Sequence, residues 1–193
     1  MAMAAGLAGL VWVSGCASPP TGTAQSPNPR AAPAPASADV AKLRLRNNAA
    51  SLLRDLLDEE KNVGKIFVIK HGEDVKPLVK LIAAAAEANE KDLLRLTNAD
   101  TELNLQALDL PPGEKAARDA MAKSKEHDLL FTSGAQFQFN LLLTQADAQN
   151  YGWHLAKVAA ENSSHPDEVA TFTRISEDMQ HLYEQTVREM RHL

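Results

Sequence analysis

The chain lacks residues on which several classes of protein depend. It has a single cysteine in 193 residues, which excludes a disulfide framework and a metal site built from several thiolates. Basic residues are not in excess, because 20 Lys and Arg stand against 25 Asp and Glu, for a formal net charge of -5. Non-specific binding to nucleic acid requires a basic face. We therefore expect no nucleic-acid partner.

Aromatic residues are also scarce, at 5% of the chain. Four of them fall on one predicted helix, at Phe137, Phe139, Tyr151 and Trp153. They could form an aromatic pocket, but so few rings are needed first for the core of the domain. We predict that they serve the core.

No apolar run is long enough to cross a bilayer as a helix, which takes about 20 apolar residues. A shorter one lies within residues 1–15, where no side chain is charged. Its length is typical of a secretory signal peptide. Val13-Ser14-Gly15-Cys16 ends this stretch and resembles the lipobox of bacterial lipoproteins. The resemblance implies cleavage after residue 15 and lipidation of Cys16.

Two or three acyl chains at Cys16 would hold the protein stably on a membrane, its one expected partner besides an unidentified protein. Ala17 and Ser18 carry no acidic retention signal of the kind known in enteric bacteria, which favours the outer membrane, with the domain facing the periplasm or the exterior. One feature departs from the pattern, since no Lys or Arg precedes the apolar run. An ordinary secretory signal, an N-terminal core helix and an earlier translation start therefore remain open.

Composition divides the chain into three parts. Residues 1–15 form the predicted signal peptide. Residues 16–38 hold the lipidated cysteine and a segment rich in Pro, Ala and Ser, which cannot bury enough apolar surface to fold and is expected to be a disordered, extended tether. Residues 39–193 have the length of one ordinary domain.

The apolar periodicity of residues 39–193 is helical throughout. Asp39 is the expected N-cap of the first helix. The predicted helices cover residues 40–70, 75–96, 114–131, 135–162 and 167–190. The run Ile66–Ile69 is rich in β-branched residues and could instead be a strand, although one strand would have no partner. Gly134 is predicted to separate two helices, because residues 114–162 as one rod would exceed about 70 Å. Long amphipathic helices with short connections indicate an antiparallel helical bundle.

Several short segments resemble a ferritin-like bacterial domain of unknown function that occurs on secreted proteins and lipoproteins. The matching segments are Gly64-Lys65-Ile66, Val75-Lys76, Ser133-Gly134-Ala135-Gln136-Phe137, Gln145 and Met179-Gln180-His181-Leu182. The resemblance covers about Glu60 to the C-terminus. It implies an antiparallel four-helix bundle, in agreement with the periodicity.

The resemblance also implies candidate metal ligands. Glu60 and His181 match a glutamate and a histidine of that domain. Other positions do not match: its Asp-His pair falls near Ala85, Ala86 and Glu87, an aspartate is replaced by Gln138, and a histidine is replaced by Gln149. Because glutamine is a poor ligand for iron or zinc, we expect no cofactor, although a di-metal site at Glu60 and His181 remains an alternative.

Catalytic motifs are absent or weak. The chain has no Gly-x-Ser-x-Gly elbow, no phosphate-binding Gly-Lys-Ser and no His-Glu-x-x-His. Ser133, His127 and Asp128 lie too close along one helix to form a hydrolytic triad. Glu189 and His192 form the only Glu-x-x-His pair, at the chain end. The leading hypothesis is a non-enzymatic envelope lipoprotein that binds a partner or supports the envelope. The alternative is a ferritin-like metal-binding protein acting in metal or oxidative stress.

Overall fold

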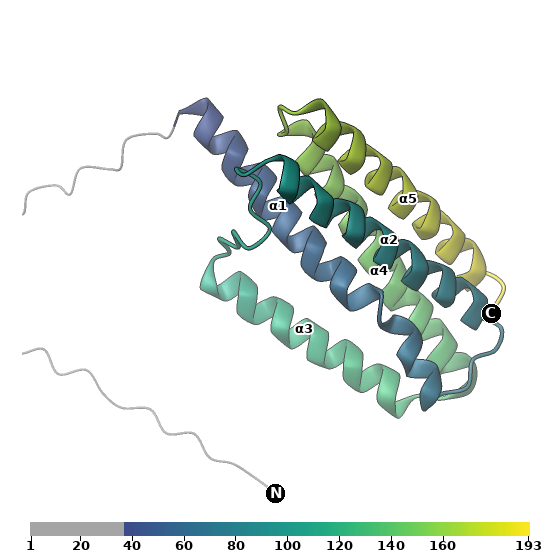
Figure 1. Cartoon of the computed structure of the whole chain (residues 1–193). Helices are drawn as coiled ribbons and strands as arrows, with labels where there is room; N and C mark the ends of the chain where they lie inside the picture. The colour runs from purple at the N-terminus through teal and green to yellow at the C-terminus, as the bar shows by residue number, and fades with distance from the viewer. Residues whose placement is uncertain (1–36) are drawn as a thin grey trace, which may run out of the picture. The chain divides into compact units, whose positions relative to one another are not determined.

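The computed structural model describes residues 37–193, which contain five α-helices and no strand (Figure 1). The elements are α1 (Ala38–Glu60), the 3-10 helix η1 (Val63–Val68), α2 (Lys76–Ala99), α3 (Pro112–Phe131), α4 (Gly134–Glu161) and α5 (Pro166–Met190). The prediction of an all-α domain is confirmed for these residues. The predicted signal peptide, Cys16 and the tether up to residue 36 lie outside them. Between residues 37 and 193, no helix is both long and apolar enough to cross a bilayer.

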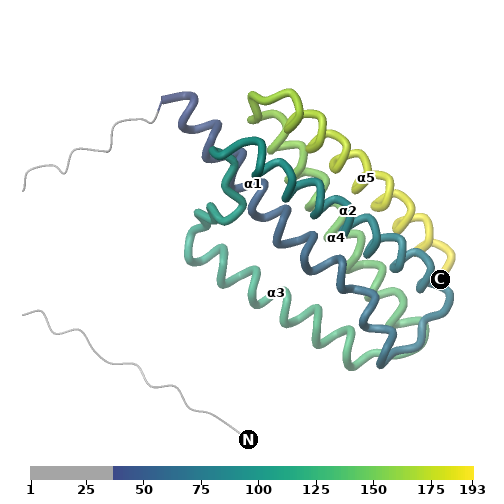
Figure 2. Tube along the Cα trace, in the orientation of Figure 1, coloured from purple at the N-terminus to yellow at the C-terminus, as the bar shows by residue number. Residues whose placement is uncertain are grey.

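Four of the helices form a bundle, and the fifth lies beside it. α1 packs against α2 and α4, and α5 packs against the same two helices. Neighbouring helices in this ring run antiparallel (Figure 2). α2 and α4 run in the same direction. The chain therefore returns along the length of the bundle after α2, as α3, before α4 begins. This packing agrees with the predicted helical bundle, and within residues 37–193 a fifth helix, α3, lies beside the four.

The first helix is shorter than predicted at its C-terminal end. α1 ends at Glu60 instead of residue 70, because Asn62 donates a side-chain hydrogen bond of 2.9 Å to the Asp58 carbonyl at the end of the helix. The chain then tightens into η1. The alternative of a strand at Ile66–Ile69 was also wrong, since Ile66 lies in a 3-10 turn and packs on the core.

The N-cap of α1 also differs from the prediction. Ser37, not Asp39, precedes the helix, and its hydroxyl accepts a hydrogen bond from the Val40 N–H at 3.4 Å. Asp39 instead lies in the first turn, where its charge favours the positive end of the helix dipole. The cap therefore lies two positions before the predicted one.

α3 and α4 form an antiparallel hairpin, as the predicted break at Gly134 required. Gly134 has a φ of 58°, a backbone conformation that side chains with a Cβ rarely adopt. No side chain of α3 is buried. Instead, the Arg118 guanidinium lies 4.9 Å from the centre of the Tyr151 ring, and Lys125 Nζ lies 3.0 Å from Asp147 Oδ2. α3 is thus held to α4 mainly by polar contacts.

The core of the four-helix bundle consists of two apolar clusters. The first contains Leu53, Leu93 and Phe172, and the second contains Ile82 and Phe137, all fully buried. Among the described residues, α1, α2, α4 and α5 all contribute to these clusters.

Candidate functional site

The interior of the bundle contains a narrow polar cavity near the end of α1. All four bundle helices line it, through Leu57, Glu60, Ile82, Ala86, Asn89, Gln149, Met179 and Leu182. It has no room for a water-sized sphere. A ligand could enter only if these side chains moved.

Glu60 is the titratable group of this cavity. Its side chain is buried, and Oε2 has no hydrogen-bond partner within residues 37–193. Burial raises the pKa of Glu60 to about 7, and a hydrogen bond with the Gln145 amide limits the rise. At neutral pH the carboxyl group therefore exists in both protonation states.

The polar groups around Glu60 are amides. Gln145 and Gln149 lie one turn apart on α4, and each has a buried Oε1 without a hydrogen-bond partner in the described part of the chain. Asn89 on α2 accepts a hydrogen bond of 2.9 Å from Arg174. The site thus combines one carboxyl group with neutral oxygen acceptors.

The structure does not bring the two predicted metal ligands together. Glu60 is in the interior, whereas His181 is exposed on α5. Two further carboxylates that could have joined them are engaged on the surface, since Glu87 pairs with Lys91 at 2.6 Å and Asp147 pairs with Lys125. Among residues 37–193, no three His, Cys, Asp or Glu side chains are grouped so that they could hold a metal ion.

A di-metal centre requires several carboxylates and imidazoles that point inward from facing helices. The interior around Glu60 offers one carboxylate and amides, and its cavity has no space for an ion. The residues described by the structure do not fit a di-metal group.

A second buried polar cluster lies at the end of the bundle where α1 begins. Arg46 Nη1 contacts Asp100 Oδ2 at 2.8 Å and Glu168 Oε2 at 3.0 Å. Burial alone would raise the pKa of Asp100, but hydrogen bonds with Glu168 and the Glu102 N–H, together with Arg46, hold it below its ordinary value. Burial raises the pKa of Glu168. This cluster joins α1, the end of α2 and the start of α5.

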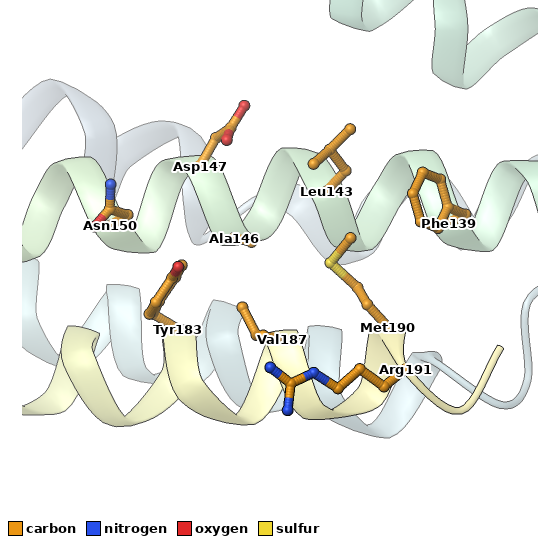
Figure 3. A pocket seen from close by; sticks show the side chains of 9 residues that line it. All are labelled: Phe139, Leu143, Ala146, Asp147, Asn150, Tyr183, Val187, Met190 and Arg191. Carbon is orange, nitrogen blue, oxygen red and sulfur yellow. The ribbon is translucent and has the colours of Figure 1, made fainter.

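The surface offers a third candidate, an open groove of about 420 Å³ between α4 and α5 (Figure 3). Its lining consists of Phe139, Leu143, Ala146, Asp147 and Asn150 from α4, Tyr183, Val187 and Met190 from α5, and Arg191 directly after α5. Figure 3 shows Tyr183, Val187 and Met190 extending from α5 toward α4. Phe139, which we predicted to serve the core, is 41% exposed and lines the groove instead, whereas Phe137 is fully buried as predicted.

The remaining candidates from the sequence are surface groups. His127 and Asp128 are both exposed, with Nδ1 and Oδ1 3.7 Å apart, and Ser133 is exposed in the turn before α4. His154 stacks on Trp153 at 4.7 Å. His192 follows the end of α5 and is exposed. None of these groups lines the cavity or the groove.

Comparisons with protein-family models, curated proteins and solved structures find no match for this chain.

Proposed function

We propose that the protein is a lipid-anchored envelope protein whose helical bundle binds a partner protein and catalyses no reaction. The anchor is inferred from Val13-Ser14-Gly15-Cys16, which we expect to direct the domain to the periplasmic or outer face of the envelope, with the outer membrane favoured. The observation that carries partner binding is the apolar groove between α4 and α5.

The groove suits an amphipathic helix of the partner. On α4, Phe139, Leu143 and Ala146 recur at spacings of three and four residues, and Tyr183, Val187 and Met190 do the same on α5. Two such parallel stripes form the groove into which the apolar face of a third helix packs. Arg191 places a positive charge on its lining, where it can pair with an acidic group on the polar flank of that helix, whereas Asp147 already pairs with Lys125.

We further propose that the bundle is a ferritin-like scaffold that has lost its metal site. A single long crossover between the second and third bundle helices is typical of ferritin-like folds, and α3 occupies that place here. Glu60 and two positions that the resemblance assigns to ligands, Ala86 and Gln149, all line the same cavity. The last two cannot bind iron as carboxylate or imidazole would, which supports a structural role for this interior.

The anchor is tested at Cys16. The N-terminal peptide of protein extracted from membranes should begin at Cys16 and carry the mass of a diacylglyceryl group and an amide-linked acyl chain. A Cys16→Ser variant should move to the soluble fraction. An unmodified cysteine in the membrane-extracted protein would contradict the lipoprotein assignment.

The groove is tested by site-specific photo-crosslinking in intact cells. A photoreactive residue at Leu143 should cross-link to the apolar face of a helix in a partner protein, as mapped by mass spectrometry, and Val187→Glu should abolish the product. The matched controls are a photoreactive residue at Leu94 and the Leu94→Glu variant, because Leu94 is equally exposed outside the groove, at 44% against 45% for Leu143. Cross-links to a second copy of this chain, or cross-links unaffected by Val187→Glu, would refute the proposal.

A further inference from the structure

Four large apolar side chains face solvent at the end of the bundle opposite the start of α1. Two follow one another at the end of η1, where Val68 is 84% and Ile69 is 63% exposed. The other two end α3, where Leu130 is 39% and Phe131 is 76% exposed. We call these four residues the apolar tip.

Hydrogen bonds hold the two halves of the tip together. Lys70, directly after Ile69, donates from Nζ to the Thr132 carbonyl at 2.8 Å and to the Leu130 carbonyl. The residues preceding each half, Phe67 and Leu129, pack on the second core cluster. In both segments, one apolar residue packs on the core, and the two apolar residues that follow it are exposed.

We propose that the apolar tip inserts into the boundary between headgroups and acyl chains of a lipid bilayer. Four such side chains offer a few hundred Å² at most, whereas a stable protein interface takes about 800 Å² from each partner. A bilayer sets no such minimum, since exposed apolar groups need to enter it by only about 5–10 Å. Lys65, three residues before the tip, is exposed and would supply a cation for lipid phosphates.

The length of chain before the bundle allows this contact. About 20 residues separate Cys16 from Ser37, and a Pro-rich segment of that length reaches about 60 Å at most. α1 has 23 residues and is about 35 Å long. A domain anchored at Cys16 can therefore bring its far end to the same membrane. Only this step rests on the proposed lipid anchor.

Tryptophan fluorescence tests insertion in the full chain. In a Trp12→Phe, Trp153→Phe background, Phe131→Trp protein is purified from membranes and reconstituted into vesicles of phosphatidylethanolamine and phosphatidylglycerol with brominated acyl chains. We expect bromine to quench this tryptophan at least about twofold more than one introduced by Leu81→Trp, an exposed apolar position on the side of α2. Equal quenching at both positions would overturn the proposal.

Partitioning of an unlipidated chain separates this proposal from the anchor. The chain from residue 16 with Cys16→Ser retains both apolar clusters of the bundle and is mixed with the same vesicles. Combined Val68→Asp and Phe131→Asp should lower its vesicle-bound fraction about tenfold, and combined Leu81→Asp and Leu94→Asp less than twofold. No difference between the pairs would refute insertion, whatever the state of Cys16. A Phe131→Trp spectrum that shifts with protein concentration without lipid would also refute it, because a second copy would then cover the tip.

Discussion

The two ends of the bundle differ in which side chains they bury and which they expose. At the end where α1 begins, which we call the closed end, charged side chains are buried: Arg46, Asp100 and Glu168 are each less than 10% exposed and contact one another. At the other end, the apolar tip exposes Val68 and Phe131 to solvent. The closed end therefore buries charged side chains, whereas the opposite end exposes apolar side chains.

The pKa values of the buried carboxyl groups differ between these two parts of the bundle. The closed end supplies a cation, Arg46, and the pKa of Asp100 falls below its ordinary value through its hydrogen bonds and this charge, against the effect of burial. Toward the tip, Glu60 is buried among apolar side chains and amides and has no ion-pair partner within residues 37–193, and burial raises its pKa to about 7. The closed end therefore places two carboxyl groups around one cation, with the pKa of Asp100 lowered and that of Glu168 raised by burial, whereas the interior beside the tip contains a single carboxyl group whose ionised form is costly.

The largest expected effect follows from removing the cation of the closed end. Arg46→Met should lower the free energy of unfolding by about 3–5 kcal/mol, because it leaves two buried carboxylates without their counter-ion. Urea unfolding at pH 7 measures this loss. The matched control is Arg44→Met, two positions earlier on α1, whose pair with Asp109 is exposed on both sides and should contribute less than about 1 kcal/mol.

Replacing the whole cluster sharpens the same test. Combined Arg46→Met, Asp100→Leu and Glu168→Leu should recover most of the lost stability, since a buried ion triad can be exchanged for apolar side chains at little net cost. An equal loss for Arg44→Met and Arg46→Met would show that the buried charges are not what holds this end together.

The next largest expected effect is a gain of stability when Glu60 is replaced, in contrast to the loss expected for Arg46→Met. The unfolded glutamate titrates near 4.5 and the folded one near 7, so the folded state binds more protons between these values. The contribution of Glu60 to stability is therefore fully present below pH 4.5 and is lost as pH rises to about 7. Glu60→Gln removes this loss and should stabilise the protein by roughly 3 kcal/mol at pH 8, with little change at pH 4.5.

Unfolding curves of the wild type and Glu60→Gln from pH 4.5 to 8 measure that difference. Glu177→Gln is the matched control, because Glu177 is exposed on α5 and should show no such trend. A difference that stays constant with pH would mean that Glu60 is not titrating in the folded interior.

Much of the fold follows from sequence pattern. The helical periodicity predicted the starts of all five α-helices to within two residues, and Gly134 marked the hairpin between α3 and α4. The end of α1 was missed because apolar residues continue at helical spacing through Ile66 and Phe67. These residues do pack on the core, but from a 3-10 helix. Periodicity reports which side chains are buried, and Asn62 determines where the hydrogen-bonding pattern changes.

The sites were less accessible from sequence. Glu60 was identified as a candidate, but its neighbours depend on how four helices align, which no local pattern specifies. Gln145 and Gln149 gave the one usable signal, two amides one turn apart on a face otherwise occupied by apolar residues such as Leu141 and Leu142. His181 was misleading because the resemblance implied an inward-facing ligand, whereas this side chain is exposed on α5 next to the buried Leu182.

A smaller loss of stability is expected from removing the hydrogen bonds that link the two halves of the tip. Lys70→Met removes the ammonium group that binds two carbonyls at the end of α3, a position where a cation also opposes the negative end of the helix dipole. We expect a loss of about 1 kcal/mol and faster hydrogen exchange in the last turns of α3. Lys65→Met, an exposed neighbour, should change neither. If exchange in α3 does not respond to Lys70→Met, polar contacts of the tip do not determine the position of this helix.

The smallest effect tests whether the tip contributes to folding at all. Val68→Thr keeps the side-chain shape and adds a hydroxyl at a position that is 84% exposed, so the free energy of unfolding should change by less than about 0.5 kcal/mol. The same exchange at the fully buried Val79 should cost about 1–3 kcal/mol, because its hydroxyl would lose water without gaining a partner. Thermal and urea unfolding of both variants measure the contrast. If Val68 can be made polar without loss of stability, folding does not require this apolar side chain. The side chain is then available for binding. A loss at Val68 comparable to that at Val79 would instead make the tip part of the core.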